Sequence, residues 1–172
     1  MSQLKFIMVD GYNVINAWQQ LKALREESLE DARDKLVDMM QDFTAYRGIK
    51  VIVVFDAHLV RGSIEKHEKY GNIEVVYTKE GETADCYIER TIVELSKKGE
   101  VGVVTFDYLE QRIAMQMGAI RITPREFLAE IQNAKKRIQE KSKLTYVEKR
   151  NGLEDRIDKS ILEKLEKMRR NL

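Results

Sequence analysis

The chain has 172 residues, of which 43% are hydrophobic and 34% are charged, a balance typical of one folded domain with a highly charged surface. No apolar run approaches the roughly 20 residues that cross a bilayer, and the first residues lack the apolar core of a signal peptide. Cys86 is the single cysteine, which excludes an internal disulfide and a cysteine-based zinc site. We therefore expect a cytoplasmic protein with no membrane association and no disulfide partner, and we take it to be a monomer.

Positive charge is concentrated at the end of the chain. Residues 135–172 contain 13 Lys and Arg against 7 Asp and Glu, a net charge of +6, which leaves −5 for residues 1–134. A basic segment after an acidic body suits a protein that binds a polyanion through the segment and cations through the body. A solvated, salt-bridged helix explains the same charges without any binding function. We expect residues 1–134 to form the main domain and residues 135–172 a basic helical extension packed on it.

Five short runs rich in Val and Ile predict strands. The runs are Lys5–Val9, Lys50–Phe55, Ile73–Tyr77, Val101–Thr105 and Ala119–Ile122. They lack strict alternation of apolar and polar residues, as do strands that are covered on both faces. Helical patterns separate most of them, so we expect an α/β fold with a mainly parallel, five-stranded central sheet.

Capping residues and glycines mark the ends of the expected helices. In chain order, these boundary residues are Ser28 and Gly48, Thr83 and Gly99, Asp107 and Gly118, and Thr123 at the start of the fourth helix. After a polar break at Lys149–Gly152, a last helix is expected to carry an apolar stripe of Ile157, Ile161, Leu165 and Met168. Because a lone short helix is marginal in water, we expect this stripe to pack on the main domain.

Residues 56–72, between the second and third predicted strands, show no sustained apolar face. A connection of this length in a compact domain is usually functional or mobile. It carries basic residues that suit phosphates and bases, namely Arg61, Lys66 and Lys69. We therefore expect a basic loop at this point of the chain.

An acidic residue follows three of the predicted strands: Asp10 after the first, Asp56 after the second and Asp107 after the fourth. The segment "KEGETADCYIER" adds Asp85 in the first turn of the second helix. Since open parallel sheets bind ligands outside the carboxyl ends of their strands, we expect the four carboxylates to lie along one edge. Taken singly, each is explained as a helix cap or a turn residue. Together, their mutual repulsion calls for a neutralising cation or proton.

A cluster of oxygen ligands favours Mg²⁺ or Mn²⁺ over softer metals. A metal held by carboxylates beside a phosphate is equipped for phosphodiester hydrolysis. Asn13, three residues after Asp10, is placed to orient a ligating carboxylate or a phosphate oxygen. The residues themselves thus indicate a metal-dependent site acting on phosphate esters.

Four segments resemble the YacP family of bacterial NYN-domain proteins, within the wider PIN-like nuclease superfamily. The segments are "VDGYNVI", "VVFDAHLV", "TKEGETADCYIER" and "VVTFDYLEQ". The blocks "DGYN" and "ETAD" are specific in combination, and the resemblance spans nearly the whole chain. It implies a PIN-like three-layer sandwich and a metal-dependent endoribonuclease that associates with the ribosome and cleaves messenger RNA during translation.

The resemblance also implies roles for individual residues. By match of motif, Asp10 and Asp85 are the principal catalytic metal ligands, and Asp107 and Asn13 complete the site. Asp56 is a further candidate metal ligand. The residues expected to bind RNA or the ribosome are Arg61, Lys66, Lys69, Lys135, Lys136 and Arg137.

One position departs from the family pattern, and two other functions stay open. The family usually has a small hydroxyl residue before the last Asp, as in "TSD", whereas Phe106 stands there in this chain and cannot donate the hydrogen bond of a Ser. The first alternative is a phosphatase with Asp10 as nucleophile, but its pattern requires a second Asp at the position of Tyr12. The second is an RNA- or ribosome-binding module whose acids are structural. Covalent trapping of a phosphoaspartate on Asp10 would support the phosphatase. Loss of cleavage with retained binding in Asp10→Asn separates the nuclease from the binding module.

Overall fold

The computed structural model describes residues 3–154 and 159–170. The chain divides into two compact units, with the first ending at Ala134 and the second beginning at Lys135. Among the described residues, no helix combines the length and the apolar character that a membrane span requires.

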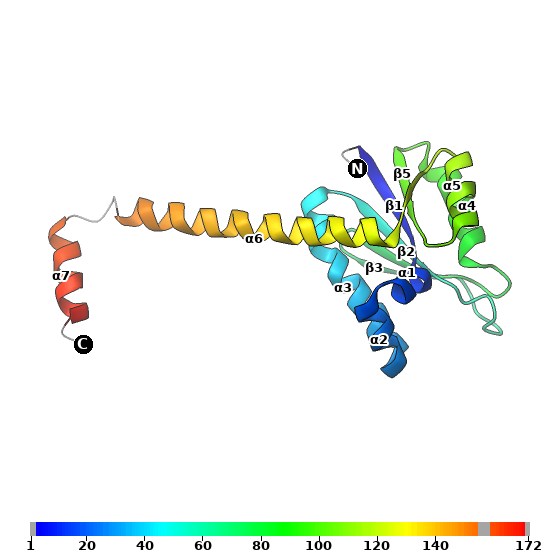
Figure 1. Cartoon of the computed structure of the whole chain (residues 1–172), viewed down its shortest axis with the longest axis horizontal. Helices are drawn as coiled ribbons and strands as arrows, with labels where there is room; N and C mark the ends of the chain where they lie inside the picture. The colour runs from blue at the N-terminus through cyan, green and yellow to red at the C-terminus, as the bar shows by residue number, and fades with distance from the viewer. Residues whose placement is uncertain (1–2, 155–158, 171–172) are drawn as a thin grey trace. The chain divides into compact units, whose positions relative to one another are not determined.

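The first unit is built on one six-stranded sheet with the strand order β3-β4-β2-β1-β5-β6 (Figure 1). The strands are β1 (Leu4–Asp10), β2 (Lys50–Phe55), β3 (Lys66–Tyr70), β4 (Ile73–Tyr77), β5 (Glu100–Val104) and β6 (Ile120–Ile122). All neighbouring pairs are parallel except β3 with β4. The expected α/β fold with a mainly parallel central sheet is therefore confirmed.

The edge strand β3 was not predicted, and the expectation of a loop over residues 56–72 was wrong in its second half. β3 pairs with β4 alone, and its five side chains are polar or exposed on both faces, so it carries no hydrophobic pattern. The signal that was present is the turn: Gly71, at φ 59°, and Asn72 form a two-residue connection between Tyr70 and Ile73. A positive φ at Gly is what tight hairpin turns require.

Several of the helices begin or end at residues that their capping chemistry selects. They are α1 (Gly11–Ala17), α2 (Gln19–Glu27), α3 (Leu29–Arg47), α4 (Ala84–Leu95), α5 (Tyr108–Gln116), α6 (Pro124–Glu154) and α7 (Lys159–Arg170). Ser28 Oγ accepts the backbone N–H of Asp31 at the start of α3, and Gly48 ends that helix at φ 65°. Thr123 and Glu126 form the expected reciprocal cap at the start of α6.

Two hydrophobic clusters fill the spaces on either side of the sheet, which makes the first unit a three-layer sandwich (Figure 1). Residues of α1, α2, α3 and the first turns of α6 pack on one face, and residues of α4 and α5 pack on the other. Along β1, Ile7 and Val9 belong to the first cluster and Met8 to the second. All three are fully buried, and this explains why the strand is apolar at consecutive positions from Phe6 to Val9 rather than at alternate ones.

The second unit consists of the remainder of α6 and of α7. The expected break at Lys149–Gly152 does not occur, because α6 continues to Glu154. The surrounding Lys, Arg and Glu residues are good helix formers, and one glycine costs only about 1 kcal/mol in a helix. On α7, Ile161, Leu165 and Met168 are exposed, while Ile157 of the same stripe lies outside the described residues. Packing of this stripe on the first unit stays a prediction.

Candidate metal centre

The strand order places the candidate site at the carboxyl end of β1. β1 lies in the middle of the sheet between β2 and β5, and all three run in the same direction. After β1 the chain turns to the face covered by α1 to α3, whereas β5 leads to α5 on the opposite face. Neighbouring connections that leave in opposite directions open a crevice at the strand ends, which is where open α/β sheets bind their ligands.

Asp10 is held at this crevice by the start of α1. It is the last residue of β1 and the N-cap of α1, where its Oδ1 accepts the backbone N–H of Asn13 at 3.3 Å. The helix can start this close to the sheet because residue 11 is a glycine. A Cβ at Gly11 would lie 2.4 Å from Cε1 of the buried Phe55 ring. The sequence Asp-Gly therefore positions the carboxylate as well as the turn.

Three carboxyl groups converge in the crevice: Asp10 from β1, Asp85 from the first turn of α4 and Glu110 from the first turn of α5. One oxygen from each can be chosen so that all three lie within 4.8 Å of one another. Asp10 and Asp85 are half-buried, whereas Glu110 is only 4% exposed. We call this group the acidic triad.

Glu110 is the most unusual member of the acidic triad. Neither of its carboxylate oxygens has a hydrogen-bond partner among the described residues, although both are buried. A buried acceptor without a partner costs roughly 1–3 kcal/mol, and more when it is charged. A ligand that completes such a group offsets this cost, and here the Glu110 carboxylate belongs to the cluster of acids.

Burial and mutual repulsion raise the pKa values of the acidic triad. Burial is the largest cause for Asp10, whose pKa rises to about 6, and repulsion from Asp85 adds to it. Burial also raises the pKa of Glu110 to about 8, with repulsion from Asp10 and Asp85. The pKa of Asp85 is raised by burial and by the charge of Asp107. At neutral pH the ion-free triad therefore retains a proton on Glu110 that a bound cation would displace.

The acidic triad fits a divalent metal ion. Three carboxylates supply hard oxygen ligands, which suit Mg²⁺, Mn²⁺ or Ca²⁺ rather than a soft metal. The two unpaired oxygens of Glu110 are the donors that such an ion would satisfy. The set contains no Cys or His, which makes a zinc site of the usual kind a poor fit. The chemistry of the donors, and not their number alone, thus matches a metal centre.

The structure places Asp107 and Asn13 beside the triad but gives their side chains structural contacts. Asp107 is exposed, and its Oδ1 accepts the backbone N–H groups of Leu109 and Glu110, so it caps α5. Oδ1 of Asn13 accepts the backbone N–H of Phe106 at 2.5 Å, which ties α1 to the connection between β5 and α5. Neither residue belongs to the acidic triad. Both lie where they hold the triad's surroundings in position.

Asp56 is also close to the triad and is also used structurally. Its Oδ2 accepts the backbone N–H of Ala84 at 3.2 Å, and its Oδ1 accepts the backbone N–H of His58 at 2.9 Å and pairs with the His58 ring. Burial opposes ionisation, yet the hydrogen bonds from His58 and Ala84 hold the pKa of Asp56 below its usual value. Because Ala84 directly precedes Asp85, this contact fixes the start of α4.

Sequence reasoning missed Glu110 because the segment "DYLE" has the pattern of a helix cap. In a capping box, the Glu three residues after the cap accepts the backbone N–H of the cap residue. Here Thr105 Oγ1 accepts that N–H of Asp107 at 3.1 Å instead, and Glu110 turns inward. A signal for Glu110 was available in the sequence. It is a Glu in the first turn of a helix that directly follows one of the inner strands of a parallel sheet.

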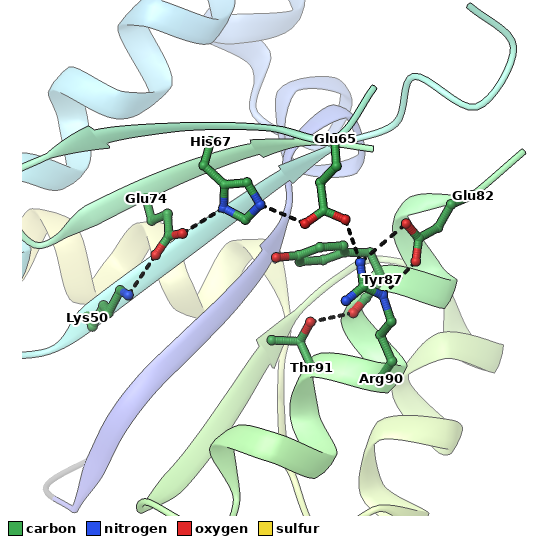
Figure 2. Close-up of polar contacts among 8 residues, drawn as sticks. All are labelled: Lys50, Glu65, His67, Glu74, Glu82, Tyr87, Arg90 and Thr91. Atoms are coloured by element: carbon green, nitrogen blue, oxygen red, sulfur yellow. Dashed lines mark hydrogen bonds and ion pairs between the residues drawn. The ribbon is translucent and has the colours of Figure 1, made fainter. Parts of the chain in front are cut away.

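A chain of ion pairs connects the β3–β4 hairpin to α4 (Figure 2). His67 lies between Glu65 and Glu74, and Glu74 also binds Lys50 of β2 at 2.6 Å. Arg90 of α4 binds both Glu65 and Glu82, each at 2.6 Å, as the dashed lines in Figure 2 show. The hairpin therefore braces the helix that carries Asp85.

The residues predicted to bind RNA fall into two groups. In the first unit, Arg61 and Lys69 are exposed, and Lys66 is exposed but paired with Glu68 at 2.6 Å. In α6, at the start of the second unit, the exposed residues are Lys135, Lys136 and Arg137. Lys66 is therefore less available to a phosphate than the sequence indicated.

Comparisons with known proteins give one consistent result. A family model described as the YacP-like NYN domain matches residues 7–170. The chain is 41% identical over 168 residues to YacP of Bacillus subtilis (strain 168), covering 97% of this chain and 98% of that protein. The crystal structure of Rae1 (YacP) from Bacillus subtilis is similar, with a TM-score of 0.71 and 40% identity over 97% of this chain and 95% of the other. A mutant of that protein matches with the same TM-score over 83% and 85% of the two chains.

Proposed function

The chain belongs to the family of YacP-like NYN domains, a nuclease-like family, and on that premise we propose that it is a metal-dependent endoribonuclease. The observation that carries this proposal is the acidic triad of Asp10, Asp85 and Glu110 at the carboxyl end of the central strand. Carboxylates that converge without a cation repel one another, so the arrangement is best explained by metal-dependent chemistry on a phosphodiester.

Asp10, Asp85 and Glu110 would hold Mg²⁺ or Mn²⁺, with the carboxylates as direct ligands. Bound there, a divalent cation supplies positive charge beside the scissile phosphate and assists the attack of water. The remaining work falls to residues that position the triad. Asp56 fixes the start of α4 through the N–H of Ala84, and Asn13 fixes the entry to α5 through the N–H of Phe106.

We infer that the substrate is messenger RNA and that the protein acts in association with the translating ribosome. Support comes from the family resemblance and from the charge of residues 135–172, which is +6. The exposed residues Arg61, Lys69 and Lys135–Arg137 supply sequence-independent attraction for a phosphate backbone. In this account the acidic triad cuts and the basic residues deliver the polyanion to it.

The test compares cleavage of a translated and an untranslated messenger by the wild type and by Asp10→Asn. The wild type is expected to cut in Mg²⁺ or Mn²⁺ and to stop in a chelator, whereas Asp10→Asn keeps RNA binding and loses cleavage. Asp38→Asn is the matched control, because Asp38 is 69% exposed on α3 and far from the triad in sequence. Unchanged cleavage by Asp10→Asn would refute the assignment, and binding without cleavage by the wild type in either metal would favour a non-catalytic module.

A second experiment tests the role of the basic extension. Charge reversal at Lys135, Lys136 and Arg137 is expected to weaken RNA or ribosome binding and to reduce its dependence on salt, because fewer counterions are released. Charge reversal of Lys97 and Lys98, after α4, provides a control of similar kind. Equal loss in both variants would show that general charge, and not this segment, determines binding.

A further inference from the structure

A group of exposed apolar side chains directly precedes Glu110 of the acidic triad in the chain. Phe106, Tyr108 and Leu109 are 74%, 71% and 63% exposed, and they stand in the five residues before Glu110. Single exposed apolar residues are common on proteins and need no explanation. Here three exposed apolar residues stand within four positions of the connection that leads to the acidic triad. Such a group indicates a contact surface. We call them the aromatic step.

The backbone under the aromatic step is held firmly. The N–H of Phe106 is bound by Oδ1 of Asn13, and the fully buried Thr105 accepts Nε2–H of Gln111 through its carbonyl at 2.6 Å. Asp107 caps α5 from within the same segment. The rings therefore project into solvent from a fixed base, so a ligand that stacks on them does not have to order a flexible loop first.

We propose that Phe106 and Tyr108 stack against unpaired bases next to the scissile phosphate, so that the enzyme cuts RNA that is single-stranded at the cleavage site. This inference rests on the proposed nuclease function and specifies its substrate. In an A-form duplex the bases are stacked on one another and are not available to aromatic side chains, whereas in a single strand they are free to stack. The aromatic step would thus select unpaired RNA by shape and without reading its sequence.

The composition of the aromatic step favours RNA over a protein partner. The guanidinium of Arg112 lies 6.0 Å from the centre of the Tyr108 ring, so a cation accompanies the aromatic surface. Aromatic rings combined with Arg are the usual means of binding single strands, since the rings hold bases while the cation attracts the backbone. The step is also joined to the acidic triad along the chain, because α5 begins at Tyr108 and carries Glu110 in its first turn, with the exposed Tyr108 and the buried Glu110 on different faces of that helix. A strand bound at the triad has to extend past the start of α5 to reach the Tyr108 ring.

The experiment measures stacking directly, using the full-length chain and a short single-stranded RNA that contains a fluorescent purine analogue. The protein carries Asp10→Asn throughout, so that it does not cut the RNA. With Phe106 and Tyr108 unchanged, binding is expected to quench the fluorescence of the purine analogue. Phe106→Ser and Tyr108→Ala are each expected to reduce the quenching and to weaken binding about 5-fold or more, the loss for one stacked base. Phe106→Trp is expected to retain both the quenching and the affinity. Met115→Ala is the matched control, because Met115 is an exposed apolar residue of α5.

Cleavage assays with Asp10 intact complete the test. KM for single-stranded RNA is expected to rise in Phe106→Ser, while the melting temperature does not fall, because an exposed ring contributes little to the fold. Equal binding or cleavage of a blunt duplex would overturn the inference, as would unchanged quenching in both variants. Loss of ribosome binding with unchanged binding of the short RNA would assign the step to a protein partner instead. None of these results alters the loss of cleavage expected for Asp10→Asn, so the proposed function is tested separately.

Discussion

Replacing Asp10 by Asn is expected to stabilise the metal-free protein at pH 8, although it removes a residue of the active site. Burial and the neighbouring acids raise the pKa of Asp10 from 3.8 to about 6. A shift of about 2 pKa units corresponds to roughly 3 kcal/mol at 1.36 kcal/mol per unit. Because the pKa is raised on folding, the protonated group favours the folded state, and this stability is lost as the pH rises from about 4 through 6. Asn cannot ionise and keeps the oxygen that caps α1, so it avoids the loss.

The assay is thermal or urea denaturation of the wild type and Asp10→Asn in a chelator across this pH range. A gain of about 3 kcal/mol at pH 8 corresponds to roughly 6–12 °C in melting temperature for a protein of this size, and the gain is expected to vanish near pH 4. Adding Mn²⁺ at pH 8 stabilises the wild type but has less effect on the variant. A variant that is less stable than the wild type at pH 8 in the chelator would refute the reasoning.

Three further predictions concern packing and metal binding. Gly11→Ala is expected to destabilise the fold by about 1–3 kcal/mol in urea denaturation, because its Cβ would overlap the Phe55 ring, and a neutral result would mean that the ring moves freely. Trp18→Phe is expected to cost about 1–3 kcal/mol, since the buried carbonyl of Pro124 loses the indole N–H at 2.8 Å; a loss well below this range would show that water replaces it. Calorimetry is expected to show Mn²⁺ affinity rising with pH up to about 8 and proton release on binding, because burial raises the pKa of Glu110 to about 8; pH-independent affinity would contradict this.

The parts of the fold that could be predicted from sequence are those in which local chemistry and burial agree. Ser28 and Gly48 mark the two ends of α3. These ends were predictable because a side-chain cap and a glycine in the left-handed conformation act on the few residues next to them. Most of the parallel strands are recognisable because burial on both faces gives them runs of consecutive apolar residues, such as Val51–Phe55. β3 lacks this signature because an edge strand buries little, and its only sequence signal was the turn at Gly71 and Asn72.

The candidate site was predictable only in part, because its geometry depends on contacts between distant segments. Asp10 is the last residue of β1 and Asp85 lies in the first turn of α4, so both were recognisable from sequence. The structure brings the two carboxyl groups together. The choice between Asp107 and Glu110 could not be made from sequence, since both fit the pattern of one helix cap. In the structure the hydroxyl of Thr105 accepts the N–H of Asp107, so the Glu110 carboxylate does not close the helix cap and lies buried with Asp10 and Asp85.

The measurement that tests the central claim most directly is the affinity of Mn²⁺ for the wild type, Glu110→Gln and Asp107→Asn, determined by calorimetry at pH 8 with folding checked by circular dichroism. Glu110→Gln removes a member of the acidic triad while keeping its size, whereas Asp107→Asn retains an oxygen that can cap α5. We expect Glu110→Gln to abolish or greatly weaken Mn²⁺ binding and Asp107→Asn to leave most of it. Retained binding in Glu110→Gln together with loss in Asp107→Asn would contradict the acidic triad as the metal centre.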